Sequence, residues 1–209
     1  MVSTPNQAIQ AALQHLATAR LGLEDYLGSD ARRRVSGLHS SIVFGRAVTN
    51  ALQNMRGKVE GFDEWYGPKQ VEMGADPGFR ALYKLRSDIL KQVEDPLTHA
   101  VQARMMDTSI FDTTPQPEGT LFGAIDTMGG PSFIVERPDG SRYQHYIEIP
   151  ASWGWRSFLS VRVGDEEVDL GPLVQRHLDY MRALIDEAQQ LFTTPPDDSE
   201  LPDWMKSSR

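Results

Sequence analysis

The sequence contains no cysteine among its 209 residues. This absence excludes a disulfide framework, a thiolate metal site and a cysteine nucleophile. A chain without cysteine is compatible with the reducing cytoplasm, where disulfides are rare. We therefore expect a cytoplasmic protein held together by a packed core, which a chain of this length can bury.

Long apolar runs are also missing, since no stretch approaches the ~18 residues of a membrane span. The first residues, Met1–Gln7, lack the basic region and apolar core of a signal peptide. We expect no membrane contact. The hydrophobic (40%) and charged (24%) fractions are those of an ordinary globular protein, and the length indicates one domain or one domain with a large insertion.

The motifs of several enzyme classes are absent as well. There is no glycine-rich phosphate-binding loop and no GxSxG nucleophile motif. No two histidines stand three or four residues apart, so a metal site would have to be assembled by the fold. We expect neither a metal nor a cofactor. The five histidines are His15, His39, His99, His145 and His177.

The charge is acidic and uneven. The net charge is −8; residues 1–100 carry 12 Lys/Arg and 11 Asp/Glu, and residues 101–209 carry 9 and 18. An acidic chain of this kind does not coat nucleic acid in bulk. Arg32-Arg33-Arg34 could form a local basic patch, although such a run is usually a solvated helix face.

The N-terminal third predicts two long helices. Thr4 to Gln7 reads as a capping box, and apolar residues at helical spacing extend the first helix over 4–27, ended by Gly28. A second helix is expected over 30–58. Because only a two- or three-residue turn joins them, the two helices must form an antiparallel hairpin. Close approach of the helices would explain Gly37 and Gly45 inside the second one.

A short helix, or two turns broken at Gly67-Pro68, is expected over 61–73. Asp76 and Pro77 then start a helix over 76–94, because Asp76 can cap free N–H groups and proline fits the first helical position. Asp95-Pro96 closes it. Its apolar face comprises Phe79, Leu82, Ile89, Leu90 and Val93.

Residues 97–170 change in character and predict strands. Leu121–Ile125 reads as a strand, and 132–136 and 142–149 flank a strong hairpin turn. A further strand is expected over 158–163. Trp153 and Trp155 are expected to cover the sheet or the helical hairpin from outside, although tryptophans could also stack on bases.

The last helix begins at Gly171-Pro172, and a polar tail follows over 194–209. We predict a mostly α fold with a β insertion (α+β). Four main helices form an antiparallel bundle, and one small antiparallel sheet is inserted between the third and the fourth. The helical bundle takes residues 1–96 and 171–193, the β-rich insertion 97–170, and the flexible tail 194–209.

Arg86 lies among the apolar positions of the 76–94 helix, and a cation beside a buried stripe needs a partner or a purpose. In one interpretation it snorkels to the edge of the stripe or pairs with a carboxylate. In the other it faces a cleft and binds phosphate.

The helical order and the segments 62–66, 73–77 and 85–91 resemble the HEPN superfamily of helical-bundle proteins. The resemblance covers the helical part of the chain. It implies a homodimer in which an arginine, a following polar residue and a histidine four to six residues after the arginine cleave RNA without metal. Arg86 matches that arginine.

The match to this motif is incomplete. Ser87 stands where asparagine is usual, and Lys91 stands where the histidine would be needed. An unperturbed lysine cannot exchange a proton near neutral pH, but it can hold a phosphate as a point charge. The resemblance therefore implies binding of RNA or a nucleotide through Arg86, Ser87 and Lys91.

Three functions follow from these observations. The first is a HEPN-like protein that binds RNA or a nucleotide without catalysis, as a homodimer, in a toxin–antitoxin, antiviral or stress system. The second is a metal-independent endoribonuclease, with Arg86 as a catalytic candidate and His99 or His177 supplying the missing group. The third is a non-enzymatic oligomerisation or partner-binding module, in which an edge strand of the β insertion recruits another chain.

Overall fold

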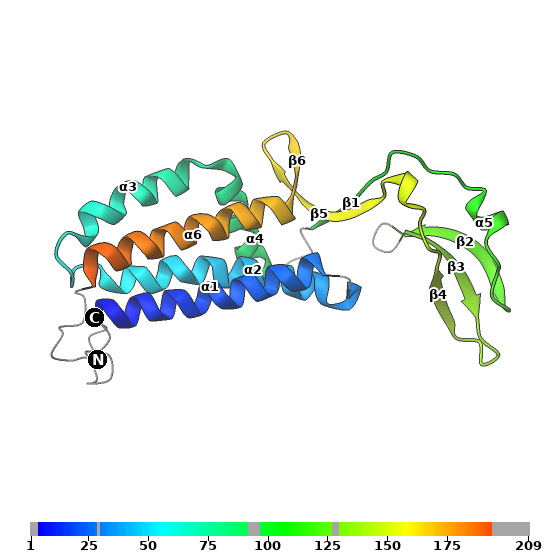
Figure 1. Cartoon of the computed structure of the whole chain (residues 1–209), viewed down its shortest axis with the longest axis horizontal. Coiled ribbons are helices and arrows are strands. Elements are labelled where there is room, and N and C mark those ends of the chain that lie inside the picture. Colours follow the sequence, from blue (N-terminus) through cyan, green and yellow to red (C-terminus); the bar gives the residue numbers. More distant parts are fainter. Residues whose placement is uncertain (1–3, 29, 92–96, 127–129, 194–209) are drawn as a thin grey trace, which may run out of the picture.

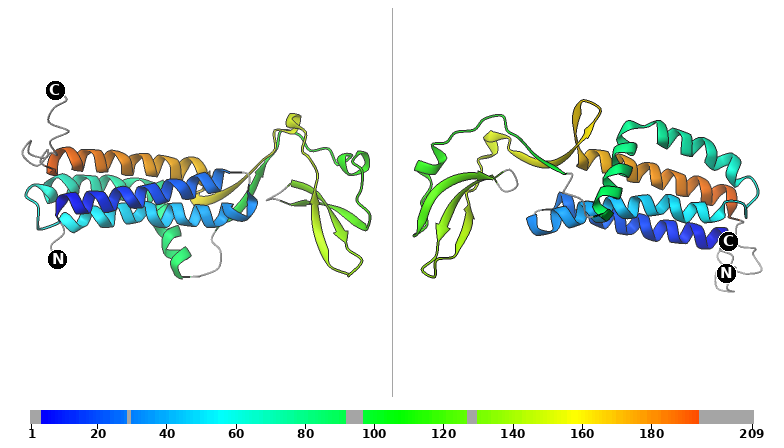
Figure 2. Two further views of the ribbon diagram at one scale, coloured as in Figure 1. Left: turned by 60° about the horizontal axis from the view of Figure 1, so that its bottom comes forward. Right: turned by 180° about the vertical axis from the view of Figure 1, so that it is seen from behind.

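The computed structural model describes residues 4–28, 30–91, 97–126 and 130–193 (Figure 1). Long helices lie side by side at one end, and a pair of strands leads from them to a smaller group of strands at the other end. The two further views show the same elongated arrangement (Figure 2). Among these residues no helix is both long and apolar enough to cross a membrane.

Helices α1 (Pro5–Leu27) and α2 (Ala31–Leu52) form the antiparallel hairpin that the sequence predicts. The capping box is confirmed, since Thr4 accepts a hydrogen bond from the Gln7 N–H and the Gln7 side chain bonds back to Thr4. The second helix is shorter than predicted. It ends at Leu52 and passes into a 3₁₀ turn, η1 (Gln53–Met55).

Two glycines bring the hairpin helices together. A Cβ on Gly22 or on Gly37 would lie 2.6 Å from the other residue's carbonyl oxygen. Gly45, farther along α2, faces α6, where a Cβ would lie 3.1 Å from Leu178. The close approach expected from the glycines in α2 is therefore confirmed, because any side chain at these positions would collide with the neighbouring helix.

Helices α6 (Leu170–Phe192) and α3 (Phe62–Ala75) complete the long bundle. The two helices are joined along their length, because Trp65 and Lys69 of α3 both donate hydrogen bonds to Glu187 of α6, at 3.1 and 2.9 Å. Helix α3 continues through Pro68 rather than breaking there.

Helix α4 (Pro77–Lys91) begins as predicted, because Asp76 accepts a hydrogen bond from the Phe79 N–H at 3.0 Å. It crosses the bundle instead of running along it (Figure 2). The Arg46 guanidinium of α2 lies over the ring of Tyr83 of α4, with the Arg46 Cζ 4.6 Å from the ring centre. Leu90 was expected on the apolar face but is 53% exposed. The predicted helix end at Val93 and Asp95-Pro96 lies outside the described residues, as does the predicted tail.

Strands β1 (Thr98–Gln102), β5 (Arg156–Val163) and β6 (Glu166–Asp169) form one antiparallel sheet in the order β1-β5-β6. We call the β1–β5 pair the ribbon. Leu159 of β5 and Leu97, just before β1, are buried in the same core as the helices. The ribbon is therefore rooted in the bundle and projects away from it (Figure 1).

The ribbon carries a second, separate unit, which we call the distal lobe (residues 103–126 and 130–155). Its sheet has the order β2-β3-β4, and it contains two short helices as well. A small core of its own is packed from Ile110, Phe133, Val135, Ile147 and Trp153. The elements of the lobe are α5 (Ile110–Thr113), β2 (Thr120–Asp126), β3 (Gly130–Glu136), β4 (Arg142–Tyr146) and η2 (Ala151–Trp153).

The predicted fold class is wrong. The described residues form six α-helices and two separate three-stranded sheets, not a bundle of four main helices with one inserted sheet. The strands divide because β1 pairs only with β5, on the helical side, while β2, β3 and β4 pair among themselves around another core. Within the bundle, α3, which was expected as a short helix or two turns, lies against α6 and is bonded to it at two places. Trp153 is buried in the lobe core rather than covering a surface.

Candidate functional site

The residues predicted to bind phosphate lie on α4. Arg86 is partly buried, and its Nε is enclosed without a hydrogen-bond partner among the described residues. The Ser87 hydroxyl donates to the Tyr83 carbonyl oxygen of its own helix at 3.1 Å. Lys91 is exposed at the last position of α4. The three residues thus share one helix, but Ser87 directs its proton to the backbone.

His99 and His177 are the histidines considered for catalysis. His99 lies on β1, opposite Leu159, and its Nδ1 is buried with no hydrogen-bond partner among the residues that the structure describes. His177 lies in the bundle core, with Phe79 edge-on at 5.0 Å and Tyr83 at 5.9 Å between ring centres. Within the described residues no hydrogen bond or ring contact joins Arg86 to either histidine.

The environment of His177 favours its neutral form. The side chain is buried, and burial together with the positive charges of Arg46 and Arg176 lowers its pKa to about 4. An imidazole with this pKa is uncharged at neutral pH. It therefore acts as an aromatic core residue, although its Nε2 has no hydrogen-bond partner among the described residues.

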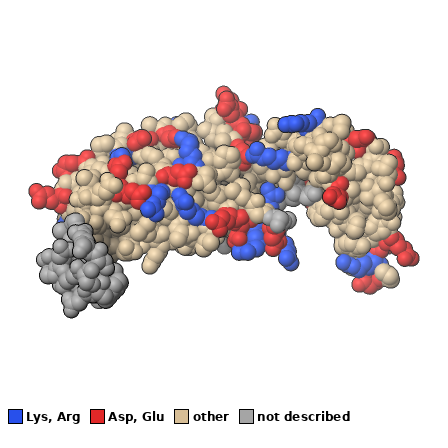
Figure 3. All heavy atoms as spheres, in the orientation of Figure 1, with Lys and Arg blue, Asp and Glu red and all other residues tan. Residues whose placement is uncertain are grey.

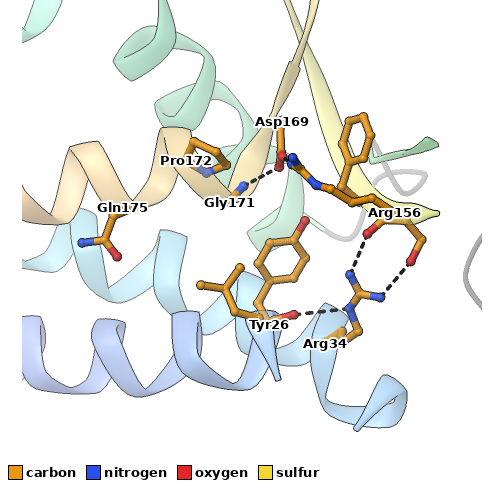
Figure 4. A pocket seen from close by; sticks show the side chains of 10 residues that line it. Tyr26, Arg34, Arg156, Asp169, Gly171, Pro172 and Gln175 are labelled. Atoms are coloured by element: carbon orange, nitrogen blue, oxygen red, sulfur yellow. Dashed lines mark hydrogen bonds and ion pairs between the residues drawn. The ribbon is translucent and has the colours of Figure 1, made fainter. Parts of the chain in front are cut away.

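A pocket of about 450 Å³ opens where the hairpin, the ribbon and the start of α6 meet (Figure 4). Arg34 of α2 spans this junction. Its Nε donates to the Tyr26 carbonyl oxygen at 3.3 Å, and its two terminal nitrogens donate to the Ser157 hydroxyl and carbonyl oxygens at 3.1 and 3.0 Å. Figure 4 shows the guanidinium turned toward β5. This arginine fastens the ribbon to the helices.

Two further charged groups of the pocket are paired with each other. Arg156 of β5 forms an ion pair with Asp169. Asp169 in turn accepts a hydrogen bond from the Gly171 N–H at 2.9 Å, and so caps α6. Tyr26 completes the junction, since its hydroxyl accepts the Leu159 N–H at 2.9 Å in a buried position. We interpret this pocket as a structural joint, because the polar groups described in it form hydrogen bonds and an ion pair with one another.

Sequence reasoning missed this joint. Arg34 belongs to a run of three arginines that was interpreted as a possible basic patch or a solvated helix face. Only the other two arginines of the run lie on a solvated face. Arg32 and Arg33 are exposed and pair with Asp30 and Asp25. The signal that could have singled out Arg34 is its place one turn before the buried Leu38.

A second hollow, of about 320 Å³, lies between α3, α4 and α6. Arg176 donates two hydrogen bonds to Asp76, at 2.5 and 3.1 Å, and these bonds hold the pKa of that carboxyl below its ordinary value. Nearby, the Tyr180 hydroxyl donates to Glu72 at 2.9 Å, and partial burial together with this bond raises the tyrosine pKa. These pairs join the three helices. No group of metal-ligating side chains is found in the part of the chain that the structure describes.

The distal lobe presents a different kind of surface. Strand β2 is an edge strand, and it exposes three large apolar side chains, Leu121 (46%), Phe122 (56%) and Ile125 (42%). Its single charged residue is Asp126 at the end of the strand. The edge strands β1 and β6 expose no large apolar side chain, and β6 carries Glu166 and Glu167. A register shift lies at Leu121, between Thr120 and Phe122, but from Phe122 to Ile125 the strand is regular and lacks the charges and prolines that usually protect a sheet edge.

The charge distribution agrees with this contrast. In the space-filling view, charged side chains are scattered over the bundle, and on the lobe they lie among a larger area of uncharged residues (Figure 3). Tyr146 of β4 adds another exposed aromatic side chain to the lobe; its hydroxyl donates to Asp126. Four exposed large apolar or aromatic side chains of the lobe therefore come from its two edge strands, β2 and β4.

Comparison with known proteins yields one family. Residues 23–141 match the family model of bacteriophage lambda protein ea47. No curated protein and no solved structure gives a match. The matched segment runs from the end of α1 through α2, α3, α4 and β1 to the turn before β4, so it includes both Arg86 and β2. Because it covers more than half of the 209 residues, the chain belongs to the family of the bacteriophage lambda protein ea47.

Proposed function

We propose that this protein is a non-enzymatic partner-binding module, which acts in the cytoplasm by adding the edge strand β2 to a strand of another polypeptide. The observation that carries the proposal is the exposed edge of β2 with its three exposed apolar residues. Strand addition gives affinity through main-chain hydrogen bonds, and the side chains of the edge give specificity. In the two pockets described in the helical part, the arginines that line the pocket are bonded to neighbouring side chains.

The shape of the chain also supports this function. The ribbon holds the lobe beyond the end of the bundle (Figure 1), where a partner can approach β2 without meeting the helices. Two anchors fix the direction of the ribbon, namely Arg34 and the Tyr26 hydroxyl. A lobe held in this way presents its edge in a fixed direction, which lowers the ordering cost of binding.

The experiment is site-specific photo-crosslinking in cells that express the full chain. A photoreactive phenylalanine analogue replaces Phe122, and a matched control carries it at Val71 of α3, which is 73% exposed. We expect adducts with a defined polypeptide from position 122 and none from position 71. Mass spectrometry of the adduct identifies the partner. Equal labelling from both positions, or nucleic acid as the only adduct, would contradict the proposal.

A second candidate function is binding of RNA or a nucleotide through Arg86, Ser87 and Lys91. The observation that favours it is the Arg86 Nε, which has no hydrogen-bond partner within the described part of the chain and so remains able to donate to an anion. The Ser87 hydroxyl, bonded to Tyr83, adds nothing to such a site. If the binding occurs, the homodimer and the stress or antiviral role implied by the HEPN resemblance would be the setting for it.

This candidate is tested with purified protein and a fluorescent RNA, in the presence of a chelator. Arg86→Ala should abolish binding or cleavage and change the free energy of unfolding by no more than about 1 kcal/mol. The matched control is Arg80→Ala, which removes an exposed arginine from the same helix. A large loss of stability in Arg86→Ala with unchanged RNA binding would assign the arginine to the core instead.

A further inference from the structure

An arginine inside the bundle has no carboxylate to balance its charge. Arg46 of α2 is partly buried, and in the described part of the chain it forms no ion pair with an acidic side chain. One of its terminal nitrogens donates to the Thr49 hydroxyl at 2.5 Å, and its Cζ lies 4.6 Å from the ring centre of Tyr83. Neither the hydroxyl nor the ring carries a negative charge. A partly buried cation usually has a partner that does.

The groups beside Arg46 offer protons but few acceptors. The buried Tyr66 hydroxyl of α3 accepts a hydrogen bond from the Gln53 side chain at 3.2 Å, and its own proton remains to be donated. The Tyr83 hydroxyl of α4 donates to the Met73 sulfur at 3.4 Å, which is a weak acceptor. We call Arg46, Tyr66 and Tyr83 the Arg46 cluster.

The two tyrosines of the cluster are donors at neutral pH and not counter-ions. Burial raises the pKa of Tyr66 and the pKa of Tyr83, and the positive charge of Arg46 offsets this only in part. Both phenols therefore keep their protons. Because Arg46 acts on both hydroxyls, the packing of α2, α3 and α4 brings two phenols to one guanidinium.

Nearby acidic side chains are bonded to other arginines. Asp76, whose charge reaches Tyr83, accepts two hydrogen bonds from Arg176. Asp63 of α3 is paired with Arg56 at 2.9 Å. These carboxylates therefore do not neutralise the Arg46 cluster, which keeps one positive charge and a surplus of hydrogen-bond donors.

We propose that the Arg46 cluster binds a tetrahedral oxyanion, that is, phosphate, sulfate or the phosphate group of a larger molecule. A guanidinium donates two parallel hydrogen bonds to such an anion. A tetrahedral anion has further oxygens for both phenols, whereas a carboxylate has only two oxygens in all. Arg46 is partly exposed, so the anion can reach it from solvent. This site is independent of β2 and goes beyond the proposed function.

The measurement is isothermal titration calorimetry of the full chain with sodium phosphate and sodium sulfate, compared with sodium chloride at the same ionic strength. We expect one site per chain for the two oxyanions and no comparable heat from chloride. Thermal unfolding provides a second readout, because an anion that binds only the folded chain raises Tm as its concentration rises.

Phenyl phosphate separates the two sources of the anion. Binding as tight as that of inorganic phosphate would support a site that accepts the phosphate group of a larger molecule. Binding of inorganic phosphate alone would support a site for the free ion.

The variants remove one donor at a time. Tyr66→Phe and Tyr83→Phe keep the rings, and each should weaken phosphate binding about tenfold, because each loses one hydrogen bond to a charged group. Arg46→Met should abolish binding, since it removes the charge and keeps the length of the side chain. Tyr180→Phe is the matched control: its hydroxyl is bonded to Glu72, outside the cluster, and its loss should leave the affinity unchanged.

Circular dichroism checks that each variant is folded. If Arg46→Met does not fold, the two phenylalanine variants still decide the proposal. Equal phosphate binding by the wild type, Tyr66→Phe and Tyr83→Phe would overturn it, and so would a wild type that binds phosphate no better than chloride. Loss of binding in Arg86→Ala but not in Arg46→Met would also overturn it, and would assign the anion to α4.

Discussion

The helical bundle and the distal lobe are built on different amounts of core. The bundle buries aliphatic and aromatic side chains from α1, α2, α3, α4 and α6, together with Leu159 of the ribbon. The core of the lobe has five buried hydrophobic residues, and most of β2 faces solvent. A sheet of three strands is close to the smallest unit that is stable alone. The bundle therefore supplies most of the buried core, whereas the lobe leaves an edge strand exposed.

This difference is tested most strongly by shortening one core side chain in each region. Leu178→Ala in α6 should lower the free energy of unfolding of the bundle by about 2–5 kcal/mol, and Phe133→Ala in β3 should lower that of the lobe by about 3–5 kcal/mol. Hydrogen exchange followed by mass spectrometry reports the two regions separately. We expect Phe133→Ala to speed exchange in the lobe while α1, α2 and α6 stay protected. Loss of protection in both regions from Phe133→Ala would show one cooperative unit.

Acid should weaken the bundle through His177. Burial lowers its pKa from 6.5 to about 4. Between these two pH values the unfolded chain binds a proton on His177 that the folded chain does not bind. Stability is complete above pH 6.5 and falls as the pH drops toward 4, by about 1.4 kcal/mol per unit. Of the groups that shape this pKa, Arg46 and Arg176 lower it and Asp76 raises it.

The check is denaturant unfolding, monitored by helical circular dichroism, at pH 7, 6 and 5. His177→Leu keeps an apolar side chain of similar bulk and should flatten the slope over this interval. The lobe provides an internal comparison, because its histidine, His145, is exposed. A bundle whose stability is unchanged between pH 7 and 5 would contradict the burial of a neutral imidazole.

The close packing of α1 against α2 can be disrupted by a single added methyl group. Gly37→Ala places a Cβ 2.6 Å from the Gly22 oxygen, so the helices must separate, at a cost of about 1–3 kcal/mol. Gly74→Ala is the matched control in α3, because nothing lies within 4 Å of its added Cβ. It should stabilise the protein by about 0.5–1 kcal/mol, since alanine is the better helix former. Thermal unfolding of both variants measures the two signs.

The smallest effect is expected at the joint between the two regions. Arg34→Lys keeps the charge but cannot make three hydrogen bonds to Tyr26 and Ser157, and should cost about 1–2 kcal/mol. Arg33→Lys changes one exposed ion pair, with Asp25, and should cost less than about 1 kcal/mol. Small-angle scattering adds a shape measurement, in which only Arg34→Lys should broaden the distribution of longest distances. Identical behaviour of the two variants would mean that Arg34 does not fasten the ribbon.

The same comparison explains what the sequence could and could not predict. The starts of α1 and α4 followed from Thr4 and Asp76, because a helix cap is a contact between residues three apart. The turn between β3 and β4 is equally local. The pairing of β1 with β5 is not, since Thr98 and Ser160 meet across 62 residues. Short strands carry no sign of such a distant partner, and the division into two sheets was therefore missed.

For the candidate site, sequence reasoning located residues but not their surroundings. Arg86, Ser87 and Lys91 do lie on one helix, yet the bond from Ser87 to the Tyr83 carbonyl depends on a rotamer that no motif encodes. The edge of β2 was expected only in general terms, as a strand of the β insertion. Its exposure became visible once β3 was seen to occupy just one of its two sides.

The placement of the lobe has a consequence for protein synthesis. Helix α6, which packs against α1 and α2, starts at Leu170, after the ribbon and the lobe. On a ribosome that adds ~5–20 residues a second, the finished α1–α2 hairpin waits roughly 7–30 s for α6 to be made. During this interval the side of the hairpin that α6 later covers, around Gly45 of α2, lies open to water. Nascent chains halted within the lobe should therefore be bound by chaperones at the hairpin, whereas chains that have completed α6 should be released.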